Sequence, residues 1–308
     1  MSTPPSTSGR RLGRTTQRRA AEAVVRTLIH ASGWIAIVIL GAIALFLVVN
    51  SIRALVEVGL PTMLSGTRWY PTSDPGIFGM LPLVLGSLMV TGVGLLLCIP
   101  LGVATAVYVS EYTGGVLKDV FKSVVEFMAA VPSVVYGLIG VAVVIPFVKQ
   151  AFGLDSGLTA LAGGIVLGVM ALPTVISISE DALHAVPESM RHASAALGNT
   201  RWQTTYKVTV PAASSGIFAA VMLGLGRAIG ETIAILMLTG NAAVMPTSVF
   251  ESVRTMTGTI AAEMGEVVQG GMHYSVLFTV GLVLFAITFT INLAADLVLE
   301  RQRKRWRR

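Results

Sequence analysis

Apolar residues in this sequence gather into long runs separated by short polar segments. The runs cover residues 33–52, 80–109, 124–148, 158–178, 216–238 and 274–299. Each is long enough to approach or cross the roughly 30 Å hydrocarbon core of a bilayer, which takes about 20 helical residues. None alternates polar and apolar positions as a barrel strand does. Because backbone in lipid must satisfy its own hydrogen bonds, the pattern predicts six transmembrane helices and an all-α integral membrane protein.

The polar segments divide the chain further. Residues 1–32 are rich in Ser, Thr, Pro and Arg, and this composition predicts a disordered, basic cytoplasmic tail. Residues 33–300 form the predicted transmembrane domain, with a cytoplasmic loop over 180–213, and residues 301–308 form a second basic tail. A cleaved signal peptide is the competing interpretation of the first apolar run, but the length of this run favours a permanent span.

Composition and charge agree with this topology. The chain is 54% hydrophobic and only 12% charged, with a mean hydropathy of +0.77. With a cytoplasmic N-terminus, seventeen of the 22 Lys and Arg residues fall on the cytoplasmic side. The positive-inside rule therefore predicts that both termini are cytoplasmic. The same bias accounts for the pI of about 9.8, so nucleic-acid binding is not expected.

Several kinds of chemistry lack the residues they need. The single cysteine, Cys98, forms no intrachain disulfide, and the four histidines show no metal-ligand spacing. The chain has no G-x-x-x-x-G-K-[ST] motif, so it holds no ATP by a P-loop. No paired carboxylates or activated nucleophile occur at reactive spacing. We therefore expect no catalytic residue, no metal and no cofactor on this chain.

The cytoplasmic loop predicts two short helices. The first can run from Pro187 to Leu197, where Gly198 can end it in the left-handed conformation. A second helix can begin at Thr200, with Gln203 completing a capping box, and Pro211 is expected to stop it. The small side chains Ala193 and Ala196 share one face with Leu197, so a partner's groove can approach closely. The pattern alone fits either a docking surface or an ordinary connecting loop.

The same loop resembles the coupling loop of ABC-importer permeases, whose pattern is Glu-Ala-Ala, three residues, Gly, nine residues, Ile-x-Leu-Pro. The matching residues here are His192, Ala193, Ser194, Gly198 and Pro211. The spacing is intact, although His replaces Glu and Ser replaces the second Ala. The resemblance implies a docking role for these residues and for Ala196 and Leu197. It also implies a six-helix permease of the type I ABC importer kind.

Further motifs are similar to the permeases of the phosphate-specific (Pst) transport system, C-type subunit. They read RWYPTSDPGIFGMLPLVLGSLMVT, AAVPSVVYGLIG and LGLGRAIGETIAILMLTGN, in this order. The resemblance implies import of inorganic phosphate across a prokaryotic cytoplasmic membrane. It also implies several partners, namely an A-type permease, two ATP-binding subunits that use the ATP, and an extracytoplasmic phosphate-binding protein.

Arg227 and Glu231 stand out because they lie within the fifth apolar run. Each charge at mid-membrane costs about 2.5–3.5 kcal/mol, whereas a helical pair four residues apart contributes only about 0.2–0.5 kcal/mol in water. The two side chains, predicted on one helix face, should therefore face the bundle interior. They can form a buried ion pair that fixes packing. Alternatively, Arg227 faces the path of an anion, with Glu231, Thr232 and Asn241 beside it.

Two other functions remain open on the sequence. A permease of the same architecture can import another oxyanion, such as sulfate or molybdate. A channel or a secondary transporter belongs to a different class, would not need the docking loop, and would carry flux without ATP.

Overall fold

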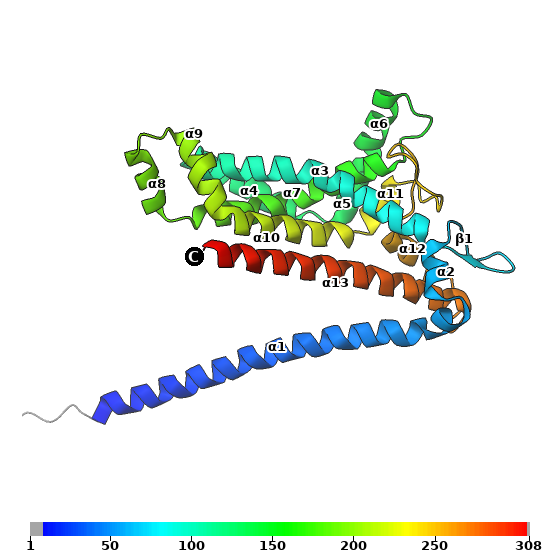
Figure 1. Ribbon diagram of the computed structural model, residues 1–308, viewed down its shortest axis with the longest axis horizontal. Helices are drawn as coiled ribbons and strands as arrows, with labels where there is room; N and C mark the ends of the chain where they lie inside the picture. The colour runs from blue at the N-terminus through cyan, green and yellow to red at the C-terminus, as the bar shows by residue number, and fades with distance from the viewer. Residues whose placement is uncertain (1–8, 307–308) are drawn as a thin grey trace, which may run out of the picture. The chain divides into compact units, whose positions relative to one another are not determined.

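The computed structural model describes residues 9–306, and helices dominate this part of the chain (Figure 1). Within residues 9–306, helical segments long and apolar enough to cross a membrane occur six times: Val24–Glu57, Leu81–Glu111, Ser133–Phe152, Ala160–His184, Arg201–Ile229 and Met272–Glu300. The predicted all-α fold with six spans is therefore confirmed. The bounds of the third and fifth spans differ from those expected, for reasons given below.

The first helix, α1 (Gly9–Glu57), is a single element of 49 residues. The chain up to Asn50 forms one compact unit and the chain from Ser51 onward forms another. The helix includes residues 9–32, which the composition predicted to be a disordered tail. This stretch contains no proline and many good helix formers, so the helix of the first span can continue backward through it. The first eight and the last two residues of the predicted tails lie outside the described residues.

Two long helices form the centre of the second unit. They are α3 (Leu81–Glu111) and α7 (Ala160–His184), and glycines let them approach closely. A Cβ atom on Gly168 would lie 2.8 Å from the Gly94 carbonyl oxygen, and one on Gly164 would lie 2.4 Å from a methyl group of Val93. Cys98 is fully buried in the same region, in a cluster with Val175, as expected for a packing residue.

The third span is broken, and the expected range of 124–148 is wrong. Its residues form α4 (Val116–Ala130), α5 (Ser133–Ile139), the π-helical turn η1 (Gly140–Val144) and α6 (Ile145–Phe152). The break lies at Val131 and Pro132, which are both extended. A proline disfavours helical geometry in the residue before it, so α4 ends at Ala130 and the apolar span restarts at Ser133.

The fifth span begins earlier than expected and also breaks. It consists of α9 (Arg201–Thr204), the π-helical turn η2 (Thr205–Thr209), α10 (Val210–Ile229) and, after a gap, α11 (Ile233–Leu238). Pro211 was expected to stop the helix from Thr200, but it lies in the first turn of α10. A proline is tolerated in a first turn, and here the wider π turn precedes it.

The short elements gather at one end of the second unit. They are α2 (Leu60–Ser65), the antiparallel strands β1 (Trp69–Tyr70) and β2 (Ile77–Phe78), and α12 (Met256–Glu263). The opposite end carries α8 (Glu188–Ala196), α9 and the C-terminal end of α13 (Met272–Trp306), as Figure 1 shows. On the predicted orientation, the end with α8 is cytoplasmic and the end with the strands is extracytoplasmic.

Candidate functional site: the cytoplasmic loop and the broken fifth span

The cytoplasmic loop folds as two short helices joined by a tight turn, as the sequence predicted. The first helix, α8, ends at Ala196, and Gly198 follows with a φ of 81°. This left-handed conformation is easily reached only by glycine. Thr200 is the N-cap residue of the second helix, α9. Its hydroxyl accepts a hydrogen bond from the Gln203 backbone N–H, while the Gln203 side chain accepts one from the Thr200 N–H. The predicted capping box is therefore confirmed.

The predicted docking residues divide into an outer and an inner set. Ala193, Ala196 and Leu197 are exposed, and Leu197 keeps 83% of its surface accessible. His192 is also exposed and lies 3.9 Å from the Glu188 carboxylate. In contrast, Ser194 is buried, and its hydroxyl lies 2.9 Å from the hydroxyl of Thr204. The outer set leaves a free surface for a partner, whereas Ser194 ties α8 to α9.

Two arginines that the sequence did not single out hold this loop on the end of α3. The Arg191 guanidinium donates to the Glu111 carboxylate at 2.8 Å and to the carbonyl oxygens of Leu183 and Val186 at 2.9 and 2.8 Å. Arg201 donates to the Glu111 carbonyl oxygen. Glu111 lies 80 residues before Arg191 and 90 before Arg201 in sequence, so no local pattern reveals these two contacts. We call Glu111, Arg191 and Arg201 the cytoplasmic clamp.

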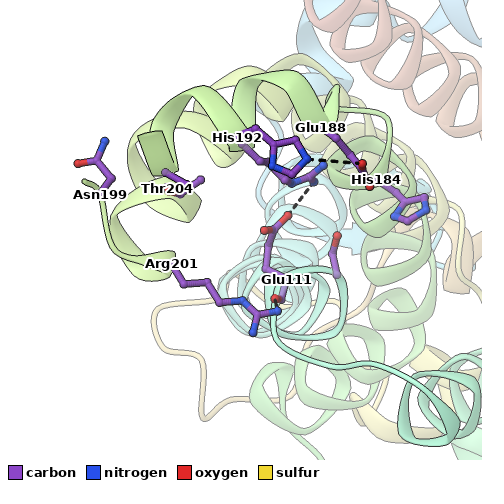
Figure 2. Close-up of a pocket in the computed structure, with 10 residues that line it drawn as sticks. Glu111, His184, Glu188, His192, Asn199, Arg201 and Thr204 are labelled. Carbon is purple, nitrogen blue, oxygen red and sulfur yellow. Dashed lines mark hydrogen bonds and ion pairs between the residues drawn. The ribbon is translucent and has the colours of Figure 1, made fainter. Parts of the chain in front are cut away.

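A cavity of about 460 Å³ lies between α8, α9 and the end of α3. Figure 2 shows Arg201 and Glu111 on one side of it, and His192, Glu188 and His184 on another. Its lining holds carboxylates, guanidinium groups, imidazoles and an amide. Such a mixture of donors and acceptors suits polar protein side chains better than an apolar ligand. The cavity adjoins the exposed docking face.

The second group of predicted residues lies where the fifth span breaks. Arg227 is in the last turn of α10 and Glu231 is in the gap before α11, so the expectation that both lie on one helix face is wrong. The α10 helix ends at Ile229, with Gly230 as its C-cap residue, and the Glu231 carboxylate then accepts a long 3.4 Å hydrogen bond from the Ala234 N–H. Thr232 is the N-cap residue of α11, and the Glu231 carboxylate adds this contact to its first turn. Within the described part of the chain, Arg227 and Glu231 form no ion pair with each other.

Arg227 keeps much of its hydrogen-bonding capacity. It is exposed, and Nη1 lies 3.5 Å from the hydroxyl of Thr174 on α7, which is a long and weak hydrogen bond. A guanidinium has five N–H donors in a planar fork, so with respect to the described part of the chain most of those on Arg227 are available to another group. A cation in the last turn of a helix is also favoured by the helix dipole. The geometry is that of an arginine able to receive an anion.

Thr232 and Asn241 lie at the two ends of α11. Thr232 precedes the helix, and its hydroxyl donates to the Gly230 carbonyl oxygen at 3.3 Å. Asn241 follows the helix with a φ of 54°. Its carbonyl and amide oxygens both accept from Arg254, so the side chain is engaged and is not aimed freely at a path. Of the four predicted pathway residues, Arg227, Glu231 and Thr232 are therefore grouped at the break.

The site can be compared with known families. The model for a binding-protein-dependent transport system inner membrane component matches residues 98–308. The chain belongs to this family. As a member with six spans, this permease is a multi-pass protein of the cytoplasmic membrane.

Relatives of this permease match it over almost its whole length. A probable ABC transporter permease protein, YqgH, of Bacillus subtilis is 38% identical over 97% of each chain. The phosphate transport system permease protein PstC of Mesorhizobium japonicum is 32% identical over 93% of each chain.

A solved structure supports the fold. The structure of a bacterial ABC transporter involved in the import of the polysaccharide alginate aligns over 92% of this permease and 99% of that chain. The TM-score is 0.61 and the identity is 14%. At this identity the match concerns the fold, which is that of an ABC importer permease.

Proposed function

We propose that this permease is the C-type membrane subunit of an ATP-driven importer that moves inorganic phosphate into the cell. The assignment of phosphate as the substrate rests on the 32% identity to the Mesorhizobium phosphate permease over 93% of both chains. Phosphate transport system permease proteins PstC of Haemophilus influenzae and Mycobacterium tuberculosis match over 87% and 90% of this chain. Three relatives from distinct bacteria thus support the same substrate.

The partners follow from the family and from the exposed coupling loop. The functional unit would contain a second, A-type permease, two ATP-binding subunits and an extracytoplasmic phosphate-binding protein. Ala193, Ala196 and Leu197 would dock in a groove of one ATP-binding subunit. ATP would be bound and hydrolysed by that subunit, and this chain would need no cofactor of its own.

The transport cycle would be alternating access driven from the cytoplasm. ATP binding would draw the two ATP-binding subunits together, and the coupling loop would carry that movement to the helices. The bundle would then open outward to receive phosphate, and hydrolysis would reset it. Arg227 would offer its free N–H donors to phosphate oxygens in passing, because a guanidinium stays charged and forms paired hydrogen bonds with them.

The test is uptake of labelled orthophosphate at low external phosphate, in cells with and without this chain. The host must lack other phosphate importers, and each measurement is repeated with excess unlabelled sulfate or molybdate. Loss of sulfate-insensitive uptake in the deletion supports the proposal. Uptake that sulfate or molybdate suppresses would assign another oxyanion. Flux that persists after ATP depletion would contradict an ATP-driven importer and favour a channel or a secondary transporter.

A further inference from the structure

The carboxylate of Glu263 organises a polar cluster at the extracytoplasmic end. Its Oε1 lies 2.5 Å from Nη1 of Arg254 and 3.0 Å from Nε1 of Trp69, and its Oε2 lies 2.8 Å from Nε2 of His273. Only 16% of the Glu263 side chain is exposed. Glu263 therefore joins α12 to β1 and to the start of α13.

Arg254 extends this cluster to the end of α11. Its Nε donates to the carbonyl oxygen of Asn241 at 3.1 Å and to the Oδ1 atom at 2.9 Å. Asn241 holds a positive φ, which asparagine tolerates better than most residues but which still needs support. The two hydrogen bonds from Arg254 supply that support. They also fix where the chain leaves α11.

The backbone of Arg254 is itself held against α3. A Cβ atom on Gly86 would lie 2.5 Å from the Arg254 carbonyl oxygen, so only glycine permits this approach. Two residues further along, the Met256 N–H donates to the hydroxyl of Ser87 at 2.8 Å. The backbone of Arg254 is therefore held against the transmembrane helix α3, while its side chain donates to Asn241.

The same segment also holds the beginning of α11. The hydroxyl of Thr257, on α12, donates to the carbonyl oxygen of Glu231 at 2.9 Å. Glu231 lies in the break of the fifth span, between Arg227 and Thr232. One short segment thus holds both ends of α11, through Thr257 at the entry and Arg254 at the exit.

We propose that residues 254–263, which we call the outer brace, position the broken part of the fifth span for passage of the anion. Arg254, Thr257 and Glu263 are positioning residues in this arrangement. They act through Glu231 and Asn241, and none of them touches the substrate. The inference rests on the proposed function only in placing the anion's path at the break. The positioning itself can be measured without any substrate.

The experiment uses the whole transporter in right-side-out membrane vesicles. Cys98 is changed to alanine, and Thr232→Cys places a single thiol at the break. The rate of labelling by a membrane-impermeant, thiol-specific methanethiosulfonate reagent reports how open the break is. The variants are Thr257→Val, which keeps the shape and removes the donor, and Glu263→Gln. Thr290→Val is the matched control, because the exposed Thr290 hydroxyl donates only to the Ala286 carbonyl of its own helix.

We expect Thr257→Val and Glu263→Gln to raise the labelling rate about 3- to 10-fold, the factor that corresponds to one lost hydrogen bond. In chains that keep the native Thr232, each of these two substitutions should also lower the maximal rate of phosphate uptake more than it changes the KM. Thr290→Val should change neither quantity. Thr257→Ser restores the hydroxyl and should return the labelling rate to that of the parent, which a folding defect would not explain.

Unchanged labelling in both brace variants would overturn the inference, even if the chain transports phosphate normally. If Glu263→Gln fails to insert in the membrane, the Thr257 pair of variants decides the question alone. Faster labelling together with no phosphate uptake in the wild-type chain would leave the brace standing and refute the substrate. The two proposals can therefore fail separately.

Discussion

The cytoplasmic clamp makes a quantitative prediction about the coupling loop. Replacing Arg191 with methionine keeps much of the length and the apolar stem of the side chain but removes the guanidinium. The Glu111 carboxylate, with 8% of its side chain exposed, then loses its ionic partner. The carbonyl oxygens of Leu183 and Val186 lose their donor as well. The coupling loop should therefore separate more easily from α3 and α7.

The size of the effect follows from burial. Removing one partner of a buried ion pair costs about 3–5 kcal/mol. The Arg191 side chain is 24% exposed, so water can replace part of what is lost, and we take the lower end, about 3 kcal/mol. This corresponds to a roughly 100-fold larger population of the open loop. Glu111→Gln in the Arg191→Met background leaves no unpaired charge, so the double variant should cost less than the sum of the two single changes.

Hydrogen exchange of the α8 backbone amides, in the intact transporter, measures this opening directly. Lys118→Met is the matched control, since the Lys118–Glu180 pair is 2.9 Å long and similarly buried but joins α4 to α7. The control should leave exchange in α8 unchanged. Wild-type exchange in Arg191→Met, or purely additive effects in the double variant, would show that the clamp does not hold the loop.

Other predictions concern residues at the break, in the coupling loop and in the loop between α11 and α12. Arg227→Lys keeps the charge but loses the planar fork, so labelled phosphate uptake at matched protein levels should fall at least about tenfold, and normal uptake would refute a role for the fork. Gly198→Pro cannot adopt the φ of 81°, so it should insert normally yet hydrolyse ATP without matching uptake, whereas Gly198→Asn should stay coupled. In the loop between α11 and α12, backbone and side-chain hydrogen bonds from Thr247 lower the pKa of Glu251 below its ordinary value of 4.5. The resulting stabilisation should be fully present above pH 4.5 and lost as the pH falls through the lowered pKa, which amide exchange at Thr247 would report. Glu251→Gln should remove this pH dependence, and a dependence that persists would refute the assignment.

The sequence predicted the local features of the fold well. Hydrophobic run length alone is enough to count six spans, because the bilayer imposes a minimum length on each helix. The coupling loop was predictable because glycine and capping residues act within one turn. Pro132 and Pro211 show the limit of this reasoning. A proline follows the end of α4 in one case and lies in the first turn of α10 in the other. Only the backbone conformation on either side of the proline decides between these two outcomes.

The candidate site was predictable in its residues but not in its geometry. Arg227 and Glu231 stand out in any apolar sequence, yet their spacing suggested one continuous helix face. The chain instead breaks between them, with α10 ending at Ile229 and α11 beginning at Ile233 after its N-cap residue, Thr232. The clamp and the brace were not predictable at all. Glu111 and Arg191 are 80 residues apart, and Trp69 and Glu263 are 194 apart, so the contacts depend on tertiary packing.

One helix touches both arrangements. Near its extracytoplasmic end, α3 receives the brace through Gly86 and Ser87, and at its cytoplasmic end its last residue, Glu111, holds Arg191. Its 31 residues span about 46 Å at 1.5 Å per residue, which exceeds the hydrocarbon thickness. Because α3 packs against α7 through glycines with backbone close to backbone, the two can slide or tilt together more easily than they can separate. A displacement of the coupling loop would thus be carried along α3 to the outer brace, which contacts both ends of α11 beside the break.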